Sequence, residues 1–118
     1  MQNITRIAVN PRMSGAVVYG GVVSLSGQVA IDHRGGPVAD QVREVLTRID
    51  DLLQEARSDR SRLLTATILL SDFAIMPEFN AAWDAWIVPG CTPTRTSMQV
   101  VLASPAYALE VVVTAATD

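Results

Sequence analysis

Hydrophobic and polar positions along the 118 residues repeat with two different periods. Alternation with period two, or a short apolar run, predicts strands at 4–9, 16–19, 22–26, 63–70, 94–102 and 107–115. Apolar residues recur at three- and four-residue spacing over 37–56 and 77–88, which predicts two helices, each with a proline in its first turn. The predicted order of elements is β-β-β-α-β-α-β-β.

The stretches between these elements indicate a single domain. Gly20-Gly21 predicts a tight hairpin turn between the second and third strands. There is no repeat, no low-complexity stretch and no linker, so residues 1–118 are expected to form one α+β domain, a mixed sheet with both helices on one face. The strands are apolar on both faces, and two helices can cover only one of them. The uncovered face therefore predicts sheet-to-sheet association in a homo-oligomer.

Composition and charge narrow the possible functions. The net charge is −3, and all nine basic residues are arginines scattered along the chain, which argues against a nucleic-acid partner. Cys91 is the only cysteine and His33 the only histidine, so the sequence predicts neither an internal disulfide nor a metal site. Residues 1–6 lack the pattern of a signal peptide, and no apolar run has membrane-spanning length. A cytoplasmic protein with no membrane contact is expected.

Arg95 is the strongest candidate for chemistry, because it interrupts a segment that otherwise has the pattern of a buried strand. A buried guanidinium is costly unless an anion satisfies it, and its planar fork matches a carboxylate with two parallel hydrogen bonds. Arg95 could therefore clamp the carboxylate of a ligand. Two structural alternatives remain open: a pair with Glu110 in the apolar final strand, or a pair with a neighbouring subunit. Structural ion pairs are the commoner arrangement.

Six segments carry a resemblance to a known family through their order and spacing. They are 12–18, 25–30, 72–74, 80–86, 93–100 and 107–111, and the most specific of them reads Pro93-Thr94-Arg95-Thr96-Ser97-Met98-Gln99-Val100. Together they span nearly the whole chain. The sequence resembles the reactive-intermediate deaminase family (RidA/YjgF), and most closely its YoaB-like branch.

The resemblance implies a chorismate-mutase-like fold that assembles as a homotrimer with a central β-barrel and clefts between subunits. It also implies hydrolysis of enamines and imines, such as 2-iminobutanoate and 2-iminopropanoate, to 2-oxo acids and ammonia without metal or cofactor. In this family the strand arginine, here Arg95, binds the substrate carboxylate. Gly27 and Ser97 correspond to positions that contribute backbone contacts, Ser97 standing where cysteine is usual.

The sequence departs from the family pattern at two places in the expected site. The usual glutamate aligns with Val112, whereas Glu110 lies two residues earlier on the same strand face, and we assign it the water-orienting role. Arg12, with Met13 and Ser14, replaces the family's Gly-Pro-Tyr motif and is expected among the substrate-binding residues. The alternative is a non-catalytic sensor of small carboxylates with the same fold. A third alternative is an endoribonuclease or a translation inhibitor, but the negative net charge of the chain argues against it.

Overall fold

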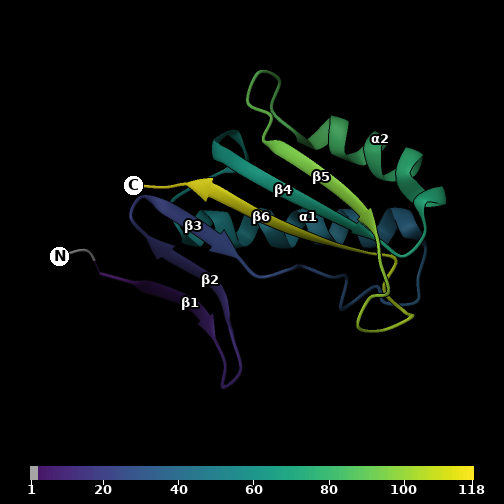
Figure 1. The fold of residues 1–118 in the computed structure, drawn as a ribbon, viewed down its shortest axis with the longest axis horizontal. Helices are drawn as coiled ribbons and strands as arrows, with labels where there is room; N and C mark the ends of the chain where they lie inside the picture. Colours follow the sequence, from purple (N-terminus) through teal and green to yellow (C-terminus); the bar gives the residue numbers. More distant parts are fainter. Residues whose placement is uncertain (1–2) are drawn as a thin grey trace.

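Six strands form one mixed sheet in the order β1-β2-β3-β6-β4-β5 (Figure 1). The structure is a computed structural model and describes residues 3–118. The strands are β1 (Thr5–Val9), β2 (Ser14–Tyr19), β3 (Val22–Leu25), β4 (Leu63–Leu70), β5 (Thr94–Gln99) and β6 (Leu109–Ala116). β4 and β5 run parallel, and all other neighbours run antiparallel.

Two α-helices cover one face of this sheet, α1 (Val38–Glu55) and α2 (Met76–Trp86), and short 3₁₀ turns precede β4 at Arg60–Arg62 and α2 at Phe73–Ile75 (Figure 1). The predicted α+β architecture and the predicted order of strands and helices are therefore confirmed. No helix within residues 3–118 is long and apolar enough to cross a membrane.

The hydrophobic core lies between the helices and the face of the sheet they cover. β6 alternates between buried residues and half-buried ones, as its period-two pattern requires. The fully buried core side chains come from α1, α2, β3, β4 and β6 and include Val23, Val42, Val45, Ile49, Leu53, Ile68, Leu70, Phe79, Leu109, Val111 and Val113. The opposite face of the sheet, which we call the open face, has no helix over it and carries Leu69, Met98, Val112 and several threonines.

The hairpin between β2 and β3 forms where the glycine pair predicts it. Gly20 and Gly21 both have positive φ, at 61° and 77°, and Tyr19 pairs with Val22. Two consecutive positive φ values define the turn whose twist matches that of the flanking strands, and glycine adopts them without steric cost.

The predicted buried strand at 94–102 is wrong in two respects. β5 ends at Gln99, because its partner β4 ends at Leu70 and the last backbone bond joins the Val100 N–H to the Leu70 carbonyl at 2.9 Å. β5 is also the edge strand of the sheet, so its residues alternate between half-buried and exposed rather than being enclosed. Val101, which continues the apolar alternation in the sequence, is fully exposed beyond the end of the strand.

Glu44 of α1 is packed beneath the loop that precedes the helix. Its side chain is only 8% exposed, and its carboxylate accepts hydrogen bonds from the backbone N–H groups of Asp32 and His33 at 3.1 and 2.9 Å. The Arg48 guanidinium donates to it at 2.6 Å, and His33 Nδ1 lies 2.8 Å away. Burial raises the pKa of Glu44, but these hydrogen bonds outweigh burial and lower it from 4.5 to about 2.

This arrangement predicts how stability depends on pH. Because the pKa of Glu44 is depressed in the folded state, its contribution is complete above about pH 4.5 and is lost as the pH falls towards 2. Glu44→Gln should lower the free energy of unfolding at pH 7 by about 1–3 kcal/mol and flatten its pH dependence between 4.5 and 2. Urea denaturation at a series of pH values measures both effects. Glu55→Gln, on the exposed side of the same helix, serves as the control, and an equal loss in both variants would contradict the prediction.

Candidate functional site

Arg95 is the second residue of β5, and its side chain lies on the helix-covered side of the sheet. Its partner in the parallel ladder is Ala66, a buried residue of β4 that faces the helices. The side chain therefore extends along the edge of the sheet towards α2. There it reaches two residues one helical turn apart, Met76 and Asn80.

Every close contact of the Arg95 guanidinium is with a neutral group. Nη2 donates to Asn80 Oδ1 at 2.6 Å and lies 3.3 Å from Met76 Sδ, and Nε donates to Ser97 Oγ at 3.4 Å. Cζ lies 5.3 Å from the ring centroid of Phe79 and 5.4 Å from that of Trp83, which is cation–π geometry. None of the ion pairs within residues 3–118 includes Arg95.

The electrostatic state of Arg95 follows from these surroundings. Partial burial lowers its pKa from the ordinary value, and the carboxylate of Asp84 acts in the opposite direction. The guanidinium nevertheless remains charged at neutral pH, because an arginine does not lose its proton in a protein. The site thus contains a half-buried permanent cation that neutral groups hold in place and that no carboxylate of residues 3–118 pairs with.

Glu110 lies on the open face of the sheet, opposite to Arg95. It pairs with Leu69 in the β4–β6 ladder, whereas Arg95 aligns through Ala66 with Val113. Residues an odd number of positions apart on one strand point to opposite faces, so Glu110 and Val113 point away from each other. The structural alternative in which Arg95 and Glu110 pair within one chain is therefore wrong. Pairing with a neighbouring subunit stays an open alternative.

Gly27 and Glu110, two of the predicted site residues, lie in direct contact. The segment after β3 is held to β6 by two backbone hydrogen bonds between Gln28 and Val111, of 2.9 and 3.1 Å. A Cβ atom at Gly27 would lie 2.1 Å from Glu110 Oε2, so only a glycine leaves room for this carboxylate position. Val112, which takes the place of the family glutamate, lies on the same open face as Glu110.

Arg12 lies apart from the other predicted residues. It is exposed in the turn between β1 and β2, where its backbone N–H donates to Asn10 Oδ1 at 2.8 Å. The strand order places this hairpin at one edge of the sheet and β5, with Arg95, at the other (Figure 1). A single chain thus presents three separate groups: Arg95 with Ser97, Glu110 with Gly27, and Arg12.

The residues that hold Arg95 were not predicted as part of the site. Phe79 and Trp83 belong to the core, where they are buried and stacked on each other with their ring centroids 5.8 Å apart. Their additional role beside Arg95 and the contact with Asn80 were missed. The signal was present in the helical spacing of α2, because positions 76, 79, 80 and 83 share one side of a helix.

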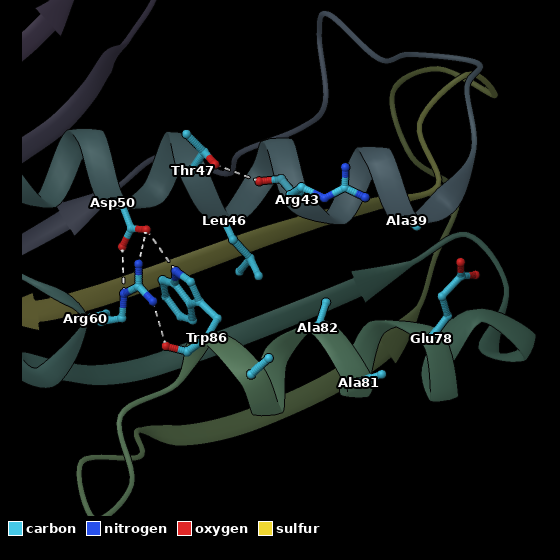
Figure 2. A pocket seen from close by; sticks show the side chains of 11 residues that line it. Ala39, Arg43, Leu46, Thr47, Asp50, Arg60, Glu78, Ala81, Ala82 and Trp86 are labelled. Atoms are coloured by element: carbon cyan, nitrogen blue, oxygen red, sulfur yellow. Dashed lines mark hydrogen bonds and ion pairs between the residues drawn. The ribbon is translucent and has the colours of Figure 1, made fainter.

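A cavity of about 590 Å³ forms a groove between α1 and α2 and contains none of the predicted site residues (Figure 2). Its charged end is a closed network: Arg60 Nε and Nη2 donate to Asp50 at 3.2 and 2.7 Å, and Trp86 Nε1 donates to the same carboxylate at 3.0 Å. Arg60 Nη1 also donates to the Trp86 carbonyl at 3.0 Å. Arg60 is therefore a structural link between α1 and α2.

Comparison with known proteins gives consistent matches over the whole chain. Residues 3–117 match the family described as Endoribonuclease L-PSP. A RutC family protein of Haemophilus ducreyi is 39% identical over 115 residues, covering 98% of this chain and 97% of that protein. The RutC family protein YoaB of Escherichia coli is 33% identical over 113 residues, covering 96% and 97%.

Two further matches concern structure and activity. The crystal structure of a YjgF family member from Neisseria meningitidis superposes with a TM-score of 0.92 at 36% identity, covering 98% of this chain and 96% of that one. A 2-iminobutanoate/2-iminopropanoate deaminase of Bos taurus is 29% identical over 98 residues, covering 79% of this chain and 70% of that protein.

Proposed function

Because the chain belongs to the RidA/YjgF family, we propose that it hydrolyses reactive 2-imino and 2-enamino acids to 2-oxo acids and ammonia. The observation that carries the proposal is Arg95, a half-buried cation surrounded by neutral groups. Such a cation is suited to bind a ligand carboxylate, since no acidic side chain of residues 3–118 forms an ion pair with it. The named activity of the bovine relative supports the same substrate class.

The proposed reaction needs little beyond binding and one oriented water molecule. An enamine first takes a proton at C3 to become the 2-iminium acid. Water then adds to C2, and the resulting carbinolamine transfers a proton from oxygen to nitrogen and releases ammonia, which leaves the 2-oxo acid. Arg95 holds the carboxylate and so fixes the position of C2, while Glu110 accepts the proton of the attacking water and returns it to the departing nitrogen.

The proposed site is assembled between subunits of a homotrimer. Arg95 and Glu110 occupy opposite faces of the sheet, and Arg12 lies at the far edge, so one chain does not bring them together. The open face exposes apolar side chains, with Met98 42% and Leu64 43% exposed. A sheet face that carries aliphatic side chains and threonines and has no helix over it is suited to burial against further copies of the chain in a central β-barrel.

The runner-up function is a sensor that binds small carboxylates without hydrolysis. Two observations favour it: valine stands at position 112 in place of the family glutamate, and Glu110 points away from Arg95 within the chain. Nucleic-acid binding is disfavoured, because Arg43, Arg48, Arg60 and Arg62 are engaged in ion pairs and leave no basic track.

A coupled assay tests the proposal. An amino-acid oxidase generates 2-iminobutanoate or 2-iminopropanoate in the presence of semicarbazide, which traps the free imine in competition with hydrolysis. The wild-type protein should reduce semicarbazone formation and accelerate ammonia release in proportion to its concentration. A protein that binds 2-oxobutanoate in calorimetry but leaves the imine lifetime unchanged would instead be the sensor.

The same assay tests the expected independence from metal. Cys91 and His33 are the only thiol and imidazole in the sequence, and no group of three or more His, Cys, Asp or Glu side chains within residues 3–118 is arranged to hold a metal ion. Treatment with EDTA followed by gel filtration should therefore change the rate by less than about twofold. A loss of activity that added Zn²⁺ or Mg²⁺ restores would contradict this expectation.

A further inference from the structure

We propose that Asn80 is a positioning residue, a neutral acceptor that orients the Arg95 guanidinium while leaving its positive charge for a ligand anion. This inference rests on the proposed role of Arg95 as a carboxylate clamp. Asn80 lies in α2 and is half-buried, and its Oδ1 accepts from Arg95 Nη2 at 2.6 Å, which is the shortest contact of that guanidinium.

The contacts of Arg95 define which of its N–H groups stay available. Nη2 is directed at Asn80 Oδ1 and Met76 Sδ, and Nε is directed at Ser97 Oγ. Nη1 donates to no acceptor within residues 3–118. Phe79 and Trp83 lie against the guanidinium through their ring faces and restrict its rotation. The arginine is thus fixed from the helix side, with the Nη1 edge left for an incoming carboxylate.

The neutrality of Asn80 is the feature that matters for function. An aspartate at this position would place a carboxylate at hydrogen-bond distance from Nη2 and form an ion pair in a partly dry site. That pair would compete with a ligand carboxylate for the same cation. The nearest charge on α2 is instead Asp84, one helical turn beyond Asn80 and exposed, where it influences the pKa of Arg95 without forming an ion pair with it.

A merely structural role for Asn80 makes a different prediction. The hydrogen bond to Arg95 also fastens α2 to the edge strand β5, next to the bond from the Phe73 N–H to Gln99 Oε1 at 2.8 Å. If fastening were its only role, Asn80→Asp would be harmless or even stabilising, because a charge-assisted hydrogen bond replaces a neutral one. The two roles therefore separate in the aspartate variant, where stability and anion affinity should change in opposite directions.

The test compares wild type, Asn80→Asp, Asn80→Ala and Ala81→Asp by calorimetric titration with 2-oxobutanoate and by thermal unfolding. Asn80→Asp should keep or raise the melting temperature while weakening 2-oxobutanoate binding about 10- to 100-fold. Asn80→Ala, which frees the guanidinium without neutralising it, should weaken binding less, about 3- to 10-fold. Ala81→Asp adds the same charge at the exposed neighbouring position and should change affinity less than twofold.

The outcomes distinguish this inference from the proposed function. Equal affinity of Asn80→Asp and wild type for 2-oxobutanoate would overturn the positioning role, whatever the melting temperatures are. A wild-type protein that binds 2-oxobutanoate but does not accelerate imine hydrolysis would overturn the deaminase proposal, while a selective loss of binding in Asn80→Asp would still support the role of Asn80. If wild type binds no 2-oxobutanoate, both proposals fail.

Discussion

Replacement of Arg95 by alanine is expected to lower kcat/KM for 2-iminobutanoate by about 30- to 1,000-fold. A bidentate, charge-assisted pair in a partly dry cleft contributes roughly 2–4 kcal/mol to transition-state binding, and each ~1.4 kcal/mol corresponds to a tenfold change. Arg95→Lys should be nearly as damaging, because lysine keeps the charge but lacks the planar fork and its fixed contacts with Asn80 and Ser97. Progress curves of the coupled assay at several substrate concentrations give the ratio.

The stability of the Arg95 variants provides the control. Loss of the cation–π contacts with Phe79 and Trp83 should cost about 1–2 kcal/mol of unfolding free energy, which is too little to unfold the domain. Arg95→Met keeps much of the aliphatic packing, so it should lose less stability than Arg95→Ala and be close to Arg95→Ala in activity. Dissociation of the oligomer in all these variants would assign Arg95 to a structural ion pair between subunits instead. Intact assembly with unchanged activity would contradict both roles.

A glutamate at position 67 is expected to abolish the oligomer. Thr67 lies in the middle of β4 on the open face, beside Val112 of β6, and a carboxylate buried there between subunits would have no partner. Light scattering at micromolar concentration should give about three times the 12.7 kDa chain mass for wild type and a single chain mass for Thr67→Glu. Ala81→Glu adds the same charge on the helix side and should leave the mass unchanged.

Circular dichroism shows whether the variant is still folded when it no longer assembles. Thr67 is half-buried in the isolated chain, so Thr67→Glu should retain its helical signal even as a monomer. A wild-type protein that is a stable monomer at micromolar concentration would contradict the proposed assembly, and with it the proposal that the site is formed between subunits.

The regular elements could be predicted because their signals are local. The strand at 63–70 matches β4 residue for residue, and the glycine pair at 20–21 correctly marks the hairpin. The end of β5 could not be predicted, because the sequence continues its apolar alternation through Val101. A strand ends where its ladder partner ends, and the pairing of Leu70, the last residue of β4, with Gln99 is a property of the tertiary structure rather than of either segment.

Some features of the candidate site could likewise be predicted from the sequence, and others could not. Residue types and the family resemblance pointed to Arg95, Gly27 and Glu110 as candidate site residues, but the direct contact between Gly27 and Glu110 was not predicted. The relative orientation of Arg95 and Glu110 could not be predicted, because alternation within each strand does not show which of its faces the helices cover. The role proposed for Asn80 was also missed, since the helical spacing places Asn80 beside Met76, Phe79 and Trp83 but does not show that Arg95 lies against that side of the helix.

The most direct test of the central claim is a crystal structure of the assembled protein with bound 2-oxobutanoate. We predict a carboxylate within hydrogen-bond distance of Arg95 Nη1, the contact between Nη2 and Asn80 Oδ1 retained, and the 2-keto carbon facing the carboxylate of Glu110 from an adjacent subunit. A structure in which an acidic side chain of a neighbouring subunit already pairs with Arg95, and in which 2-oxobutanoate binds elsewhere or not at all, would contradict the account.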